Sequence, residues 1–241
     1  MQAVILAAGK GTRMQPLTFH IPKPMARIAG KNLLEHNMEK LPNKIDEIII
    51  VVSYLKEQII NHFGSVFQGR KIVYIEQKNM LGTAHALFQC KDKLKSEFIV
   101  FMGDDLYGKE DFEKIINSDK PAMLVKKVRS GFTGGKVIFD KNGDLKDIKE
   151  GKHKNSGFVN AALYKLGKGF FDTKMVKISP NSKEYGLPQT LIKYAQNKAV
   201  STIESKSWRQ ISDIDDLKRV EKQIMKESKN KEYKSYLNYF D

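Results

Sequence analysis

The sequence contains one cysteine, Cys90, and no long hydrophobic run. A single cysteine cannot form an internal disulfide, and in an apolar helical setting we expect Cys90 to be a small core residue rather than a nucleophile. Wholly apolar stretches, such as residues 48–52, are far shorter than the roughly 20 residues needed to cross a bilayer. The N-terminus also lacks the basic-then-apolar pattern of a signal peptide. We therefore expect a cytoplasmic protein without a membrane partner.

Acidic residues are in the minority. The 28 aspartates and glutamates face 42 lysines and arginines, which gives a formal net charge of +14 and a pI of about 9.6. Positive charge can indicate nucleic-acid binding, but the lysines here are spread almost evenly and do not cluster beside aromatic residues. We therefore expect no nucleic-acid partner. A positive field also attracts small phosphorylated molecules, so the charge alone does not identify the partner.

No stretch rich in proline, glycine or serine divides the chain, and no internal repeat is present. With 241 residues, 41% of them hydrophobic, the chain can bury a sizeable core. We therefore predict one domain, 1–241, made of two halves, 1–128 and 129–241.

Short apolar runs alternate with amphipathic segments through the first half. Four runs fit strands that are buried on both faces: 3–8, 47–53, 71–77 and 97–103. Four segments have apolar residues at helical spacing: 32–41, 55–63, 83–94 and 109–116. This alternation predicts an α/β fold, with an open, mostly parallel, Rossmann-like sheet and helices on both of its faces.

The second half changes character after a predicted strand at 122–128. Asn142-Gly143 lies between two segments of alternating hydrophobicity, which is a strong signal for a β-hairpin. Further elements are predicted in chain order: a strand at 157–166, a helix at 187–196, a strand at 199–204 and a closing helix at 213–225. In the closing helix, Leu217, Val220 and Ile224 share one face. The lysine-rich tail from Lys226 is expected to be a frayed surface helix.

A glycine-rich turn with Gly9 and Gly11 follows the first predicted strand. Because glycine has no Cβ, backbone N–H groups in such a turn can approach a phosphate closely. The third glycine of a dinucleotide-binding fingerprint would fall at Met14, and no G-x-x-x-x-G-K-[ST] pattern occurs in the chain. The turn therefore fits neither of these two phosphate-binding loops.

Two cations accompany the turn: Arg13 directly behind the glycines, and Lys23 between two prolines. A guanidinium can hold two phosphate oxygens at once, and a lysine on a proline-stiffened turn keeps its charge near a fixed place. The arrangement therefore indicates phosphate chemistry.

The stretch LAAGKGTRMQPLTFHIPKPM, 6–25, resembles the signature of the sugar-1-phosphate nucleotidylyltransferases, G-x-G-T-R-x-x-P-L-T followed by P-K-P. The resemblance continues through IEQKNMLGTAHAL (75–87), MGDDLY (102–107), IKEGK (148–152), GFVNAALY (157–164) and Trp208. It implies a uridylyl- or thymidylyltransferase-like enzyme that joins UTP or dTTP to a sugar-1-phosphate and releases pyrophosphate. Glucose-1-phosphate is the default sugar. Residues 1–128 would then bind the nucleotide, and 129–241 the sugar.

The resemblance implies that Arg13 and Lys23 are catalytic. Arg13 would neutralise the triphosphate and the departing pyrophosphate, while Lys23 would draw the sugar phosphate towards the α-phosphorus; such a transfer depends on alignment and cancellation of charge. The implied nucleotide-binding residues are Ala8, Gly9, Gly11, Thr12, Gln77, Gly82 and Thr83. The Gln77 amide suits the donor and acceptor edge that uracil and thymine share, so UTP and dTTP are not distinguished. Gly82 would let the backbone reach the base.

A Mg²⁺ ion bridging the phosphates is also implied, and Asp104 at the end of a strand suits this hard cation. Asp105, on the other side of the pleat, is expected either to be structural or to support the metal ligands without binding the ion itself. The family has a second metal-binding acid in the pattern W-x-D-I-G-T, but this chain has WRQISD, with Gln210 at that place. The Gln210 amide could be the ligand, Asp213 could take its place, or Asp104 could suffice with phosphates and water.

For the sugar, the resemblance implies Gly135, Glu150 and Asn160, whose carboxylate and amide groups suit hydroxyls. Two departures leave the sugar open: Gly151 replaces the lysine expected after Glu150, and Ala162 replaces a glycine after Asn160.

Two further polar residues have simpler explanations, and other functions stay open. We expect His85 to be a packed or capping residue, and Glu184 to serve a helix N-terminus. A cytidylyltransferase acting on phosphocholine is the closest enzyme alternative, although the Q-x-x-x-L-G-T segment argues against it. Because of Gln210, a non-catalytic nucleotide-sugar-binding protein is the other alternative. The sequence has no hexapeptide repeats, so we expect no acyltransferase domain within it, and it leaves open whether the chain forms a homo-oligomer.

Overall fold

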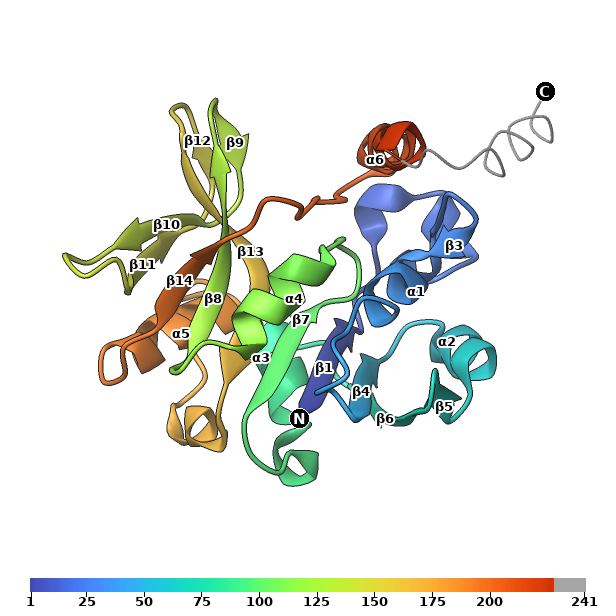
Figure 1. Cartoon of the computed structure of the whole chain (residues 1–241), viewed down its shortest axis with the longest axis horizontal. Coiled ribbons are helices and arrows are strands. Elements are labelled where there is room, and N and C mark those ends of the chain that lie inside the picture. Colours follow the sequence, from blue (N-terminus) through green and yellow to red (C-terminus); the bar gives the residue numbers. More distant parts are fainter. Residues whose placement is uncertain (228–241) are drawn as a thin grey trace.

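A ten-stranded sheet runs through both halves of the chain in the computed structural model, which describes residues 1–227 (Figure 1). The expectation for the lysine-rich tail falls almost wholly outside these residues. The strands are β1 Gln2–Ala7, β2 Arg27–Ile28, β3 Lys31–Asn32, β4 Glu47–Val52, β5 Val66–Phe67, β6 Arg70–Glu76, β7 Phe98–Met102, β8 Ala122–Val128, β9 Phe132–Thr133, β10 Lys136–Phe139, β11 Leu145–Lys149, β12 Lys152–His153, β13 Gly157–Leu166 and β14 Ser201–Glu204.

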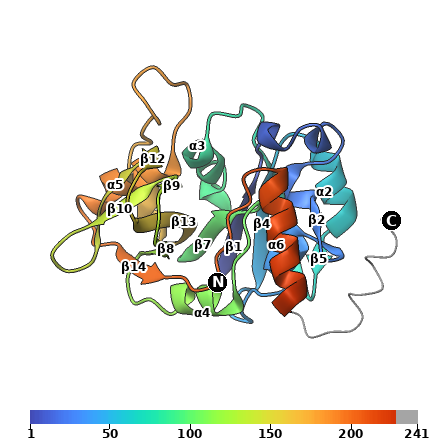
Figure 2. The ribbon, with the colours of Figure 1, turned by 90° about the horizontal axis from the view of Figure 1, so that it is seen from above.

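Helices cover both faces of this sheet, as predicted, and α3 and α4 lie on opposite sides of it (Figure 2). The α-helices are α1 Leu33–Met38, α2 Lys56–Phe63, α3 Thr83–Phe88, α4 Lys109–Ile116, α5 Leu187–Ala195 and α6 Ile214–Glu227. Short 3₁₀ turns lie at Thr12–Met14, Leu17–Phe19, Lys23–Met25, Lys91–Lys93 and Lys168–Asp172.

The centre of the sheet is parallel: β1 pairs with β7 on one side and with β4 on the other, and β4 pairs with β6. Side chains of β1 alternate between two cores. Ala3 and Ile5 pack with α1, α2 and α4, whereas Val4 and Leu6 pack with α3 and α5. Every residue of β1 is buried, as expected of a strand covered on both faces.

The other side of the sheet is antiparallel and is organised by the long strand β13, which pairs with β7, β8 and β10. The β10–β11 hairpin forms around Gly143, whose φ is 81°, so the hairpin prediction is confirmed. The register of β13 against β8 shifts between Asn160 and Tyr164, and Ala162 within this bulge has a φ of 51°. Bulges of this kind redirect side chains beside functional sites.

Most predicted elements appear within a few residues of their expected bounds. The helix predicted at 83–94 ends at Phe88, and a 3₁₀ turn at Lys91–Lys93 follows it. Three short strand pairs were not predicted. These are β2–β3, β9–β12 and β5 against β6. A ladder of two residues is too short to show alternation in the sequence. None of the helices in residues 1–227 has the length and apolar character needed to cross a membrane.

Helix α6 packs against a third core formed by the turns around β1 and β7. Its Val220 is fully buried there, with Leu217 and Ile224 partly buried on the same face, as predicted. The Glu221 carboxylate accepts a hydrogen bond from Ala29 N at 2.9 Å, which ties α6 to the β2–β3 turn. Asp213 caps the helix by accepting from Asp216 N at 2.9 Å.

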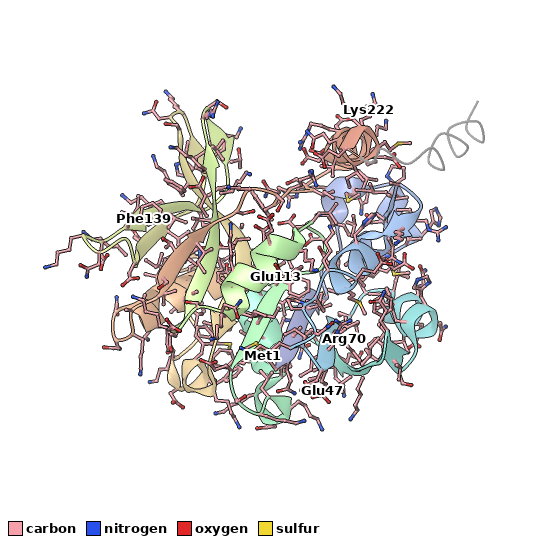
Figure 3. All side chains as sticks on the ribbon, in the orientation of Figure 1. Met1, Glu47, Arg70, Glu113, Phe139 and Lys222 are labelled. Atoms are coloured by element: carbon pink, nitrogen blue, oxygen red, sulfur yellow. The ribbon has the colours of Figure 1, made fainter. Side chains whose placement is uncertain are left out.

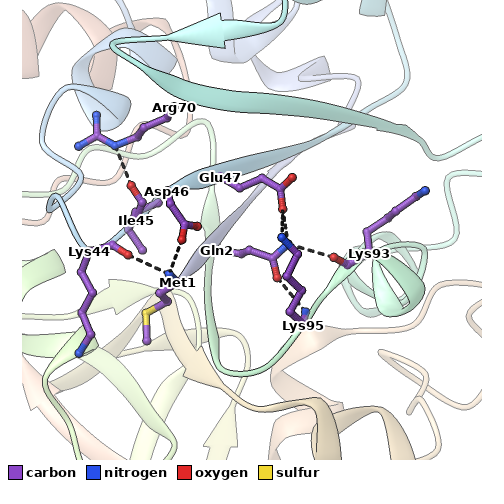
Figure 4. Close-up of polar contacts among 9 residues, drawn as sticks. All are labelled: Met1, Gln2, Lys44, Ile45, Asp46, Glu47, Arg70, Lys93 and Lys95. Atoms are coloured by element: carbon purple, nitrogen blue, oxygen red, sulfur yellow. Dashed lines mark hydrogen bonds and ion pairs between the residues drawn. The ribbon is translucent and has the colours of Figure 1, made fainter.

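Polar contacts close the amino-terminal end of the central strands (Figure 4). The Met1 ammonium donates to Lys44 O at 2.9 Å, and Arg70 donates to Ile45 O at 3.0 Å. Gln2, next along the chain, joins β1 to the end of the 91–93 turn and to β4. In Figure 3, Met1 and Arg70 lie at this end, away from α6, which carries Lys222. The carboxyl ends of the strands are thus left for a site.

Asn37 of α1 fixes the loop that follows β7. Its Nδ2 donates to Asp105 O at 2.7 Å, and its Oδ1 accepts from Tyr107 N at 3.1 Å. All of these groups are buried, and Asn37 has no exposed surface. The Asn37 side chain therefore holds two backbone groups, Asp105 O and Tyr107 N, of the loop that carries Asp104.

Replacing Asn37 by alanine is expected to lower the free energy of unfolding by about 2–4 kcal/mol, because two buried backbone groups lose their partner. Asn61→Ala, an exposed change within α2, is the matched control and should alter stability by no more than about 0.5 kcal/mol. Urea denaturation followed by circular dichroism measures both. Equal stabilities for the two variants would contradict the role given to Asn37.

Candidate active site

Three adjoining cavities open at the carboxyl ends of β1 and β7. The largest of the three has a volume of about 600 Å³ and is lined by Gly9, Gln77 and Gly82. The central cavity, of about 220 Å³, is lined by Arg13, Lys23 and Asp104. The third, of about 230 Å³, is lined by those same three residues together with Glu150 and Asn160. We call the first the nucleotide cavity and the third the sugar cavity, after the ligands that the sequence predicts for the residues in their walls. Together, the three cavities bring all the predicted site residues to one edge of the sheet.

The glycine-rich turn leaves β1 and forms the wall between the nucleotide and central cavities. Gly11 has a φ of 64°, and a Cβ there would lie 2.9 Å from Lys23 Cβ, so a larger residue would push the two turns apart. Thr18 Oγ1 donates to Gly11 O at 2.9 Å and braces the turn. A Cβ on Gly9 would meet nothing within 4 Å. Gly11 is thus required for packing, while Gly9 keeps the cavity open.

An ion pair in the central cavity joins the turn that carries Lys23 to the loop that carries Asp104. Lys23 Nζ lies 2.6 Å from Asp104 Oδ2, and the side chains are 7% and 27% exposed. No group of residues 1–227 donates a hydrogen bond to Asp104 Oδ1, and the Arg13 guanidinium has no ion pair or hydrogen bond within that range. One positive group and one carboxylate oxygen therefore remain available to a ligand.

Asp105 also lines the sugar cavity, but it is only 8% exposed, and both of its carboxylate oxygens have partners within the protein. It accepts from Trp208 Nε1 at 3.1 Å and from Ile211 N at 3.2 Å. Burial, followed by repulsion from Asp104, raises the pKa of Asp105 to about 7. Its contacts are those of the structural group expected from the sequence.

The segment that contains Gln210 is held beside Asp104 by backbone pairing. Leu106 N donates to Arg209 O at 3.0 Å, and Arg209 N donates to Leu106 O at 2.9 Å. Gln210 and Ser212 both line the sugar cavity, and Ser212 also lines the central one. Asp213 lines none of the three cavities and caps α6 instead.

The donor set suits a hard cation that completes its shell with ligand oxygens. Asp104 has a free carboxylate oxygen, and Gln210 brings an amide to the wall of the same sugar cavity. Mg²⁺ is commonly held by one or two carboxylates with substrate phosphates and water. Within residues 1–227, no group of three or more histidine, cysteine, aspartate or glutamate residues is placed to hold a metal.

Gln77 and Gly82 both line the nucleotide cavity. Gln77 Nε2 donates to Gly82 O and contacts His85 Nδ1, both at 3.0 Å, so the amide nitrogen is already engaged. A Cβ on Gly82 would clash with Tyr185 O, and the φ of Gly82 is 91°. Close approach of the backbone around Tyr185 is therefore enough by itself to require this glycine.

Thr83 lies on the wall shared by the nucleotide and sugar cavities. Its Oγ1 accepts from Leu187 N, the first residue of α5, at 2.9 Å. The hydroxyl thus caps α5 and retains its proton for another acceptor.

Sequence reasoning missed several residues of these walls. Met80 and Ile178 line the nucleotide cavity although they are 37% and 48% exposed, and Lys10 and Glu184 line it as well. Glu184 was expected to serve the start of a helix, but it lies in the cavity wall. Lys10 sits inside the glycine-rich motif and could have been found from its position, whereas Met80 and Ile178 lie in loops without a pattern.

The sugar cavity contains Gly135, Glu150 and Asn160, as the resemblance implies. A Cβ on Gly135 would lie 2.9 Å from Glu150 Oε1, so the glycine lets the carboxylate approach the strand. Loss of solvent raises the pKa of Glu150, and the nearby His153 opposes this change. Asn160 Oδ1 accepts from Ala162 N at 2.9 Å, and its Nδ2 donates to Tyr164 Oη at 2.7 Å.

Comparison with known proteins identifies relatives along most of the chain. The family model described as Nucleotidyl transferase matches residues 2–227. Bifunctional protein GlmU of Methanocaldococcus jannaschii is 37% identical over 173 residues, which are 71% of this chain and 41% of that protein. UTP–glucose-1-phosphate uridylyltransferase AglF of Haloferax volcanii is 29% identical over 218 residues, which are 87% of this chain and 90% of that protein. The chain spans about half the length of the GlmU relatives it matches.

Solved structures share the fold. The inositol-1-phosphate CTP transferase of T. maritima superposes with a TM-score of 0.76 at 22% identity, over 95% of this chain and 96% of that one. HddC from Yersinia pseudotuberculosis gives a TM-score of 0.72 at 23% identity, over 92% and 99%. Because the family model covers all but the first residue of the part that the structure describes, the chain belongs to the nucleotidyl transferase family, as its glycine-rich motif predicts.

Proposed function

We propose that this protein joins a nucleoside triphosphate, UTP or dTTP, to a sugar-1-phosphate, with glucose-1-phosphate as the default sugar, and releases pyrophosphate. The observation that carries the proposal is the central cavity, which adjoins both of the others. It shares Arg13, Lys23 and Asp104 with the sugar cavity, and it shares Gly9, Gly11 and Thr12 with the nucleotide cavity. Two anionic reactants placed in the outer cavities would meet at the central one. The name of the relative AglF, a UTP–glucose-1-phosphate uridylyltransferase, supports a sugar-phosphate substrate.

The chain's own contribution to this reaction is positional and electrostatic. Attack of a sugar phosphate oxygen on the α-phosphorus brings two anions together and needs in-line alignment with little covalent assistance. Arg13, which has no partner among residues 1–227, would neutralise the triphosphate and the departing pyrophosphate. Lys23, held by Asp104, would direct the sugar phosphate. Glu150 and Asn160 would bind sugar hydroxyls.

Mg²⁺ is part of the proposal, with Asp104 and Gln210 as the residues that would hold it. When bound, the ion would neutralise phosphate oxygens and orient them. Because Gln210 is neutral, the site would carry one negative charge fewer than a pair of carboxylates, and affinity for the ion would depend strongly on the bound phosphates.

The test is pyrophosphate release by the purified full-length chain, with each common nucleoside triphosphate combined with each of a panel of sugar-1-phosphates and with phosphocholine. Turnover with UTP or dTTP and a sugar-1-phosphate supports the proposal. Turnover only with CTP and phosphocholine would replace it with the cytidylyltransferase alternative. Tight binding of a nucleotide sugar without any turnover would favour a non-catalytic binding protein, the candidate that Gln210 motivates.

Asp104→Asn is expected to reduce turnover by at least about 100-fold, because it removes the charge that holds Lys23 and would bind the ion. Asp92→Asn makes the same chemical change at an exposed position away from the cavities and should leave turnover unchanged. Steady-state pyrophosphate release and thermal denaturation of both variants give the comparison. Near-normal turnover in folded Asp104→Asn protein would remove this residue from the reaction.

Gln210→Asp is expected to strengthen Mg²⁺ binding about tenfold in the presence of a non-hydrolysable UTP analogue, because a second carboxylate adds charge to the ligand set. Gln223→Asp adds the same charge on an exposed part of α6 and serves as the control. Isothermal titration calorimetry measures both. Equal Mg²⁺ affinity for the two variants would show that Gln210 does not face the ion.

A further inference from the structure

Two polar contacts, both made by its amide nitrogen, hold the Gln77 side chain in the wall of the nucleotide cavity. The side chain is 3% exposed, and its Nε2 lies 3.0 Å from Gly82 O and 3.0 Å from His85 Nδ1. The Gly82 carbonyl can only accept a hydrogen bond, so the amide nitrogen, and not the oxygen, must face it. Within residues 1–227, no group donates to Gln77 Oε1, which leaves this oxygen for a ligand.

The orientation of Gln77 determines which nitrogen of His85 carries the proton. A neutral imidazole has one donor and one acceptor nitrogen, so Nδ1 must accept from Gln77 and Nε2 must carry the hydrogen. Burial lowers the pKa of His85, which favours this neutral form. Gln89 Nε2 lies 3.2 Å from His85 Nε2. Gln89 is exposed, and a half-turn of its amide group would bring the amide oxygen to this place, where it could accept from Nε2.

We infer that His85 is a positioning residue for nucleotide selection, which it achieves by turning the Gln77 amide so that only an acceptor faces the nucleotide cavity. This inference rests on the proposed function and deepens it, because it concerns the base that the same cavity takes. His85 touches neither reactant. It acts through Gln77, with Gly82 O as the second anchor.

An acceptor in this place selects among bases by whether the ring nitrogen that faces it, N3 of a pyrimidine or N1 of a purine, carries a hydrogen. Uracil, thymine and guanine carry an N–H there and donate to Gln77 Oε1. Cytosine and adenine in the same pose present an unprotonated nitrogen, and two acceptors facing each other lose a hydrogen bond and repel. The nucleotide cavity is therefore matched to UTP, dTTP or GTP and works against CTP and ATP.

The first experiment is independent of activity. A ¹H–¹⁵N correlation spectrum of the imidazoles in ¹⁵N-labelled full-length protein at neutral pH reports the tautomer of each histidine, and loss of one signal in His85→Phe assigns His85. We expect the proton on Nε2. A proton on Nδ1 would overturn the inference, whatever the enzyme does.

The second experiment uses nucleotide preference. His85→Phe keeps a ring but removes the acceptor, so the ratio of kcat/KM for UTP to that for CTP should fall about tenfold, chiefly through KM for UTP. His85→Asn places an acceptor oxygen near the position of Nδ1 and should restore most of the ratio. Gln89→Ala, which leaves His85 Nδ1 in place, is the matched control and should leave the UTP-to-CTP ratio of kcat/KM unchanged. If His85 served only in packing, His85→Phe would change kcat/KM for UTP and for CTP alike, and His85→Asn would not restore the ratio. That outcome would overturn the inference.

The outcomes separate the two proposals. If no nucleotide is turned over but UMP binds more tightly than CMP and His85 carries its proton on Nε2, the proposed reaction fails and the role of His85 stands. If the protein turns over CTP in preference to UTP, dTTP and GTP, the role of His85 is wrong even though the enzyme is a nucleotidyltransferase.

Discussion

The contact between Lys23 and Asp104 is the interaction on which the whole site depends. It joins the turn after β1 to the loop after β7, and these strands are direct neighbours in the sheet, with Leu6 opposite Met102. Burying a lysine at 7% exposure is costly unless a carboxylate lies beside it, so each charge stabilises the position of the other. The Lys23–Asp104 pair therefore fixes one wall of the central cavity, and Arg13 in the same cavity remains available to bind an anion.

The parallel order of the strands explains why these groups meet at all. Carboxyl ends of adjacent parallel strands open at one edge of a sheet, which is where α/β proteins bind ligands. Here the amino-terminal ends are closed by contacts of Met1, Gln2 and Arg70, so the other edge is the open one. The bulge in β13 then turns Asn160 towards the same edge from the antiparallel side.

Much of this arrangement could be predicted from the sequence. Runs such as 48–52 are wholly apolar, as in strands covered on both faces, and the motifs from 6–25 onwards occur in the order found in the family. The site residues Arg13, Lys23 and Asp104 were predicted because they lie in motifs that resemble those of the sugar-1-phosphate nucleotidylyltransferases, beside a glycine-rich turn, a proline-stiffened turn and a strand end. Other features depend on segments that are distant in the sequence. The close packing of Gly82 against the backbone of Tyr185 could not be predicted, nor could the hydrogen bond by which the Gln77 amide nitrogen donates to the Gly82 carbonyl.

The backbone pairing between residues 81–84 and 185–187 has a mechanical consequence. Tyr185 N donates to Leu81 O at 2.7 Å, Ala84 N donates to Tyr185 O at 3.0 Å, and Leu187 N donates to Thr83 at 2.9 Å. These bonds join a wall of the nucleotide cavity to a wall of the sugar cavity. Moving one wall away from the other would break all three bonds at once, so this pairing fixes the spacing between the two cavities.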